Sequence, residues 1–358
     1  MSGVYHPRPN PIVAAMYTAR DMNIDVIVMH GPAGCSFMAS RPLENAGVRV
    51  VTSSMKDNDL IFGGGPSLEK ALKESKERFS PKTIAVIGTC ASTIIGDDIK
   101  AIIGRVDLGD TNCFAIDCHG CMDNNTEGAI RALKAGANAG IIPKEEYERQ
   151  TKLLKAATSL EKSKGMAGRT YLSPAQSPTK LAVCKRISET LSKGGKVAVV
   201  MIAKKELAYR FADMFEAVDS SCKNLGGSTF FVANLDKDKG LPRIRGYCED
   251  ILRDFDKAGV KMDRIIGGLD EYAVIGEEMA EAVKGFNPDL TVVLGICHGY
   301  PALDENCILV TDQPRELKNY LDQGFSAVGE AGSHGMVMGA HSIVNLETAQ
   351  TLRELNGL

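Results

Sequence analysis

Unbroken runs of valine and isoleucine recur along this chain and alternate with amphipathic helical patterns. The runs cover residues 24–30, 48–54, 83–89 and 113–118, and two of the helical patterns between them cover 67–79 and 94–106. A strand that is apolar on both sides is buried on both faces, which happens when helices cover both faces of a parallel sheet. The first part of the chain is therefore predicted to be a doubly wound, Rossmann-like α/β lobe.

A second series of apolar runs follows further along the chain, at residues 196–202, 228–234, 263–269, 290–296 and 307–312. The stretch between the two series is charged and has a helical pattern, and residues 159–178 are rich in Gly, Ser and Pro, which is typical of a connection. We predict an N-terminal lobe over 1–141, a helical and polar connection over 142–193, a second α/β lobe in one or two parts over 194–325, and a helical C-terminal tail over 326–358.

The composition limits where the protein works and what it binds. A formal net charge of -3 lacks the basic excess of a general nucleic-acid binder. The longest apolar runs fall well short of the roughly 18 residues that a membrane span needs, and the start of the chain lacks a signal-peptide pattern. These features indicate a cytoplasmic protein without a membrane partner. Thiols stay reduced there, so those of the ten cysteines that have a function are expected to bind metal or react.

Two cysteines follow predicted strands of the first lobe. Cys35 lies in the Gly/Pro turn after residues 24–30, and Cys90 comes directly after the run at 83–89, before a helical pattern. Loops at the carboxyl ends of parallel strands are where sites gather in such folds, and a helix N-terminus favours a thiolate, which binds soft metals. Position alone leaves a metal ligand and an ordinary loop cysteine equally open for both residues.

The pair Cys118 and Cys121 forms a C-x-x-C motif after the fourth run. No second C-x-x-C completes a zinc site, and Met122 stands where a haem-attachment motif has histidine. We keep Cys118 as a possible further cofactor ligand, and packing is the favoured interpretation for Cys121. The chain has no phosphate-binding G-x-x-x-x-G-K-[ST] motif, so any ATP hydrolysis belongs to another chain.

Taken together, the motifs resemble those of nitrogenase component-one subunits. "HGPAGCSF" (30–37), "DLIFGGGPSLEKAL" (59–72) and "GTCASTIIGDDIKAI" (88–102) occur in the order known from that family, and "DCHGCMDN" (117–124) is similar to its next segment. The resemblance implies doubly wound domains, an iron-sulfur cluster held by Cys35 and Cys90 at a subunit interface, and a partner iron protein that hydrolyses Mg-ATP and supplies electrons.

The chain departs from nitrogenase in its cysteines. Large nitrogenase subunits carry one more cluster cysteine upstream of the H-G-P motif, whereas residues 1–29 contain none here. A cubane takes four thiolates, so two cysteines per chain are too few for it. From this count we infer a homodimer in which Cys35 and Cys90 of both chains hold one [4Fe-4S] cluster on the twofold axis. A third ligand such as Cys118 would undo this arrangement.

The chain is also shorter than nitrogenase subunits, and it resembles the nitrogenase-like reductases of tetrapyrroles. That resemblance implies a multi-electron reduction of a nickel tetrapyrrole ring with lactam closure, in coenzyme F430 biosynthesis. His298, His334 and His341 are the candidate proton donors, and the last two share a face if their segment is helical. Alternatives are a protochlorophyllide reductase type of enzyme, a non-catalytic scaffold for a metal cofactor, and a binding module without a cluster.

Three polar residues inside the motifs leave two interpretations each. His30 either supports the cysteine loop or caps its strand, and we favour a structural role. Asp97 and Asp98 are either proton relays or acidic residues that favour the first turn of a helix.

Overall fold

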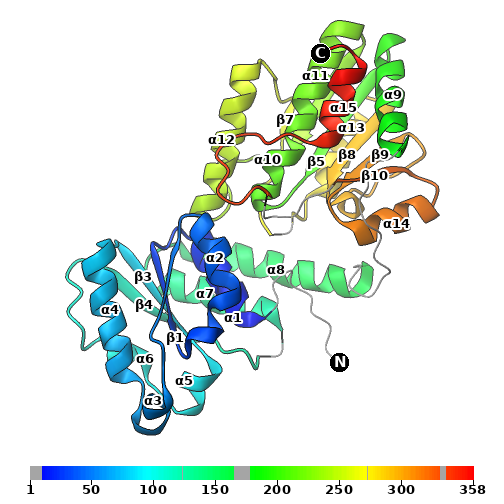
Figure 1. Ribbon diagram of the computed structural model, residues 1–358. Coiled ribbons are helices and arrows are strands. Elements are labelled where there is room, and N and C mark those ends of the chain that lie inside the picture. The colour runs from blue at the N-terminus through cyan, green and yellow to red at the C-terminus, as the bar shows by residue number, and fades with distance from the viewer. Residues whose placement is uncertain (1–9, 123, 165–177, 272, 331–335) are drawn as a thin grey trace. The chain divides into compact units, whose positions relative to one another are not determined.

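The computed structural model describes residues 10–122, 124–164, 178–271, 273–330 and 336–358 (Figure 1). The chain divides into two compact units, Met1–Ala167 with Leu241–Arg243, and Gly168–Gly240 with Ile244–Leu358. Each unit contains its own parallel sheet.

The first unit is built on a four-stranded sheet in the order β2-β1-β3-β4, with β1 Val26–His30, β2 Arg49–Thr52, β3 Thr83–Gly88 and β4 Asn112–Ile116. All three strand pairs are parallel. The strand order reverses between β1 and β3, so this sheet is doubly wound as predicted. Its core joins Val28 and Val86 of the sheet to Leu68 and Leu72 of a covering helix.

The helices of the first unit are α1 Pro11–Asp21, α2 Phe37–Asn45, α3 Asp57–Phe62, α4 Gly65–Phe79, α5 Cys90–Ile94, α6 Ile99–Ile103, α7 Asn125–Asn138 and α8 Lys144–Lys164, with a 3-10 turn η1 at Ala33–Cys35. Helices α1 and α7 pack closely together. A β-carbon at Gly128 of α7 would lie 2.1 Å from the carbonyl oxygen of Pro11, so only glycine permits this approach.

The second unit has a six-stranded parallel sheet in the order β10-β9-β8-β5-β6-β7. The strands are β5 Lys196–Ile202, β6 Ser228–Ala233, β7 Arg264–Ile265, β8 Leu290–Gly295, β9 Cys307–Thr311 and β10 Ser326–Gly329. The helices and 3-10 turns of this part of the chain are α9 Pro178–Ser192, η2 Lys205–Leu207, α10 Ala208–Phe211, α11 Asp213–Leu225, α12 Pro242–Ala258, α13 Gly276–Lys284, η3 Cys297–Gly299, α14 Pro314–Asp322 and α15 Glu347–Leu355.

Several elements differ from the sequence-based predictions. The helix expected over 94–106 is shorter: α5 ends at Ile94, Gly96 has a φ of +73°, and α6 starts with Asp98 as its N-cap and covers only Ile99–Ile103. The tail expected to be helical from 326 instead begins with strand β10, which pairs with β9. The tail ends in helix α15, and residues 340–346, all within the described part of the tail, contain no helix. The condition for a shared helical face of His334 and His341 is not met at His341, and His334 lies outside the described residues.

Candidate functional site: a cysteine cluster at the switch point

The two predicted cluster cysteines follow the two central strands of the first sheet. Cys35 lies in the loop after β1, and Cys90 lies directly beyond the end of β3. These strands are neighbours in register, with His30 paired to Gly88, and they flank the point where the strand order reverses. Loops on either side of such a reversal separate and leave a crevice at the carboxyl ends of the strands. The topology therefore places two cysteines that are 55 residues apart in the sequence on either side of this switch point.

Cys35 is the last residue of η1, and it is exposed. Its backbone N–H donates a hydrogen bond to the carbonyl oxygen of Pro32 and is not available to a thiolate. Burial of the thiol and, second, the nearby thiol of Cys90 raise the pKa of Cys35. The prediction that a helix terminus favours a thiolate at Cys35 was thus wrong, because the residue ends a short turn.

Cys90 is held at the start of α5 by the residue before it. The Thr89 side chain caps the helix, with the Thr89 N–H donating to Ser92 Oγ at 2.9 Å. Thr89 Oγ1 also donates to the carbonyl oxygen of His30 at 3.0 Å, which ties the β3 loop to the end of β1. A β-carbon at Gly31 would lie 2.3 Å from that Thr89 oxygen. The glycine of the H-G-P motif is therefore required for the close approach of the two cysteine loops.

The C-x-x-C motif after β4 directs its two thiols in different ways. Cys118 is buried, its sulfur lies 3.7 Å from Met122 Sδ, and burial raises its pKa to about 12. Cys121 is exposed, and its sulfur lies 3.5 Å from that of Cys90. The expectation that Cys121 is a packing residue was wrong. A third thiol therefore stands beside Cys90, although the residue kept as a possible further ligand was Cys118.

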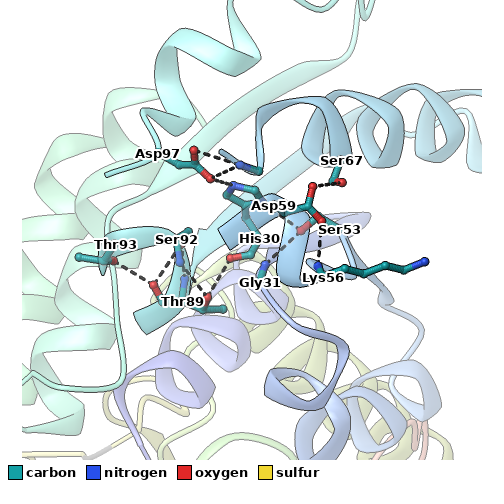
Figure 2. Close-up of polar contacts among 11 residues, drawn as sticks. His30, Gly31, Ser53, Lys56, Asp59, Ser67, Thr89, Ser92, Thr93 and Asp97 are labelled. Atoms are coloured by element: carbon teal, nitrogen blue, oxygen red, sulfur yellow. Dashed lines mark hydrogen bonds and ion pairs between the residues drawn. The ribbon is translucent and has the colours of Figure 1, made fainter. Parts of the chain in front are cut away.

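The side chain of His30, in the first family motif, contacts Asp97 of the third motif (Figure 2). Its ring is fully buried, with Nε2 2.9 Å from Asp97 Oδ2 and Nδ1 3.0 Å from Ser53 Oγ. Because an ionised carboxylate only accepts, Nε2 carries the proton and Nδ1 accepts from the Ser53 hydroxyl. Burial lowers the pKa of His30 despite the opposing effect of Asp97, in keeping with this neutral form. The structural role favoured for His30 agrees with these contacts.

Asp97 receives its remaining hydrogen bonds from the second motif. The backbone N–H of Gly64 donates to Oδ2 at 3.0 Å, and a β-carbon at Gly64 would lie 2.7 Å from the same oxygen. Asp59, also in that motif, accepts from the Lys56 N–H at 2.8 Å and from Ser67 Oγ at 2.8 Å (Figure 2). Asp97 is thus a structural acceptor between two motifs, while Asp98 caps α6 by accepting from the Ala101 N–H.

Four large apolar side chains beside these loops are exposed to solvent. They are Phe37 at 76%, Ile61 at 71%, Phe62 at 84% and Ile94 at 82%. Phe37 lies two residues beyond Cys35, Ile94 lies four beyond Cys90, and Ile61 and Phe62 end the short helix α3. Apolar residues gathered on the surface around a functional loop are typical of an interaction surface. We call these four residues the flanking apolar residues.

The two described candidate histidines lie in the second unit and contact different helices. His298 is in η3 after β8, and its Nδ1 lies 2.5 Å from Oε1 of the buried Glu316 of α14. Tyr320 donates to the other oxygen of Glu316 at 3.1 Å. His341 is 82% exposed, with Nδ1 3.5 Å from Asp250 Oδ2 of α12. The contacts of these two histidines therefore do not converge on one site.

The donor set fits a sulfur-ligated iron cluster better than a single hard metal ion. Within the described ranges, no three or more His, Cys, Asp and Glu side chains form a group that would hold a metal ion. The first unit instead has three accessible thiols, which are soft ligands. Cys35 and Cys121 are exposed, and Cys90 is half-buried. Thiolates are the usual ligands of iron-sulfur clusters.

Comparison with known proteins identifies the class of protein that this fold and these motifs define. The family model for nitrogenase component 1 type oxidoreductases matches residues 11–216. A segment of the nitrogenase molybdenum-iron protein alpha chain of Clostridium pasteurianum is 38% identical over 88 residues, which is 22% of this chain and 16% of that one.

Two archaeal proteins are similar over nearly their whole length. The "Ni-sirohydrochlorin a,c-diamide reductive cyclase complex, component CfbD" of Methanothermobacter thermautotrophicus is 42% identical, over 97% of this chain and 98% of its own. The protein of the same description from Methanosarcina acetivorans is 40% identical, over 98% of this chain and 97% of its own. The chain therefore belongs to the nitrogenase component 1 type oxidoreductases and, within them, to the family of these CfbD components.

Among the helices of the described ranges, none has the length and apolar character that a membrane span requires.

Proposed function

We propose that this protein is the catalytic component of a nitrogenase-like, ATP-dependent reductive cyclase. Its substrate would be Ni-sirohydrochlorin a,c-diamide, whose ring it reduces in a multi-electron reaction that promotes lactam closure in coenzyme F430 biosynthesis. The observation that carries the proposal is the full-length identity of 42% and 40% to two proteins named as components of that cyclase. These names do not favour the alternatives of a protochlorophyllide reductase or a passive scaffold.

The proposed cofactor is a [4Fe-4S] cluster held by Cys35 and Cys90. When bound, such a cluster supplies one-electron transfer at low potential. The chain's own contribution is to hold the two thiols on short loops whose positions are set by Thr89, Gly31 and the His30–Asp97 pair. A cubane takes four thiolate ligands, and Cys35 and Cys90 supply two per chain. We therefore propose that the cluster bridges two copies of the chain.

The flanking apolar residues support this homodimer. Phe37, Phe62 and Ile94 lie next to or near the cysteine loops, and each is more than two-thirds exposed. If two copies meet at a shared cluster, the same contact covers these side chains and removes their apolar surface from water. The electron donor would be a separate iron protein that binds Mg-ATP, since this chain carries no phosphate-binding loop.

We propose His298 as one candidate proton donor. It follows β8 at the carboxyl edge of the second sheet, where ligands bind in open α/β folds. The carboxylate of Glu316 orients its ring through Nδ1 and would stabilise the imidazolium form. His334 and His341 stay predictions as further donors.

The proposal is tested by anaerobic reconstitution of the purified chain with iron and sulfide, followed by turnover with a reduced iron protein, Mg-ATP and Ni-sirohydrochlorin a,c-diamide. We expect about one cubane per two chains and a loss of the substrate's visible absorption as the ring is reduced. An unchanged absorption spectrum, with the cluster present, would support the scaffold alternative instead. A cluster-free chain would support a simple binding module.

A further inference from the structure

The first unit contains a pocket of about 750 Å³ that the cysteine cluster does not account for. Helices α6, α7 and α8 and the edge strand β4 contribute its walls. The volume is within the range of small-molecule sites, which is roughly 300–1,000 Å³. The pocket lies wholly within one compact unit, since its lining residues run from Lys100 to Lys155.

The charged side chains of the pocket are mainly basic. Lys100, Arg131, Lys134 and Lys155 line it, against the carboxylates of Asp117 and Glu127. Arg131 already pairs with both carboxylates, at 3.0 Å and 3.3 Å. None of the three lysines forms an ion pair with a carboxylate among the residues that the structure describes. The four basic and two acidic side chains therefore give the pocket lining a net charge of +2, which favours an anionic ligand.

The rest of the lining is apolar and partly open. Ile103, Phe114, Ile130 and Tyr147 contribute to the walls. Thr151 also lines the pocket, and its hydroxyl is buried without a hydrogen-bond partner within the described ranges. Buried hydroxyls are normally paired, so this one is available to a bound polar group. Apolar walls with a few convergent polar groups are typical of a small-molecule site.

The pocket also borders the cysteine cluster. Asp117 lines it and is followed directly by Cys118, the first residue of the C-x-x-C loop that brings Cys121 to Cys90. Arg131 Nη1 donates to both the backbone oxygen and Oδ2 of Asp117, at 3.1 Å and 3.0 Å. These hydrogen bonds link Arg131 in the pocket wall to the start of the C-x-x-C loop. A ligand in the pocket would therefore lie beside this loop.

We propose that this pocket binds the tetrapyrrole substrate, with Lys100, Lys134 and Lys155 pairing with its peripheral carboxylates and the apolar walls contacting the ring. The inference rests on the proposed function and adds to it the location of the substrate and the residues that recognise its charge. Binding in this pocket is expected to weaken as salt increases, because the lysine contacts are partly exposed.

The test measures the equilibrium binding of Ni-sirohydrochlorin a,c-diamide to the chain through the visible absorption of the ligand. Binding is measured with and without the cluster, and no iron protein is present. The double variant Lys134→Glu and Lys155→Glu reverses two pocket charges, and we expect roughly tenfold weaker binding or more. The control Lys144→Glu and Lys152→Glu makes the same charge change on α8 outside the pocket lining, and we expect binding within about twofold of the wild type.

The outcomes separate the two proposals. Equal binding by the pocket and control variants, with the wild type binding normally, would overturn the pocket assignment and leave the proposed function standing. If the wild type neither binds nor reduces the nickel tetrapyrrole, the proposed function fails. A Lys134→Gln and Lys155→Gln variant, with its circular dichroism and cluster content compared with the wild type, gives the same answer should the glutamate variant fold poorly.

Discussion

The sulfur atoms of Cys90 and Cys121 lie 3.5 Å apart, although 31 residues separate them in the sequence. This proximity arises because β3 and β4 are parallel neighbours whose following loops leave the sheet at the same edge. A β-carbon at Gly120 would lie 3.2 Å from the Cys90 sulfur, so the C-x-x-C loop itself lies against Cys90. When no cluster is bound, the Cys121 thiol is therefore close enough to react with Cys90.

The first prediction is that the cluster-free protein forms a disulfide between Cys90 and Cys121 under a mild oxidant such as oxidised glutathione. The two thiols lose two protons, and the two electrons reduce the oxidant. Peptide mapping without reduction is expected to find this bond ahead of any bond to buried Cys118 or Cys184, since attack requires access. A Cys121→Ser variant serves as the control. Recovery of Cys90 mainly linked to Cys35 would contradict the prediction.

The second prediction concerns cluster ligation. Cys35→Ser and Cys90→Ser are each expected to lower bound iron from about four atoms per two chains to background, because a cubane needs all four thiolates. Cys222→Ser is a matched control, since this half-buried thiol lies on α11 in the other unit. Iron and sulfide analysis with electron paramagnetic resonance of the reduced protein measures the effect. Full iron retention by Cys35→Ser would refute the assigned ligands.

The third prediction concerns the polar network beneath the loops. Asp97→Asn removes the charged acceptor of buried His30 and of the Gly64 N–H, and we expect a loss of about 1–3 kcal/mol in the free energy of unfolding. Asp98→Asn is the matched control, because asparagine caps a helix about as well as aspartate and this variant is expected to be nearly neutral. Urea denaturation near neutral pH measures both. Equal stabilities for the two variants would argue against the network.

The fourth prediction is a pH dependence of stability from His30. Its pKa in the folded chain is below 6.5, so below that value the unfolded chain binds more protons than the folded one. The contribution of His30 to the free energy of unfolding is therefore complete above pH 6.5. This contribution is lost as the pH falls below 6.5 towards the pKa of His30 in the folded chain. In a His30→Gln variant, the free energy of unfolding is expected to decrease less as the pH is lowered below 6.5. The measurement is urea denaturation as a function of pH, and parallel curves for both proteins would contradict the assignment.

The fifth prediction concerns the homodimer. Phe62→Asp places a charge at the most exposed of the flanking apolar residues, and we expect it to shift the protein from dimer to monomer. Size-exclusion chromatography with light scattering measures the change on the cluster-loaded protein. Leu358→Asp, at an exposed apolar position of the second unit, is the control and should leave the dimer intact. An unaffected dimer in Phe62→Asp would place the interface elsewhere.

Much of this protein was predictable from local sequence. Buried parallel strands show as unbroken apolar runs, so the α/β class was predicted correctly, and most strand positions were correct to within two residues. The short strand β10 was missed because its four residues, Ser326–Gly329, include two glycine or serine positions and make a weak signal. Motif order also led to Cys35 and Cys90 as cluster ligands, which stays a prediction.

The sequence by itself determined the chemistry available, namely which thiols follow which strands. Only the tertiary structure decided which thiols meet. Cys118 and Cys121 are three residues apart, yet one packs inward and the other reaches Cys90. The same holds for the basic pocket, whose lysines come from α6, α7 and α8. The direction of a side chain, and which side chains meet in space, depend on contacts between segments that are distant in the sequence. Local sequence patterns do not specify those contacts.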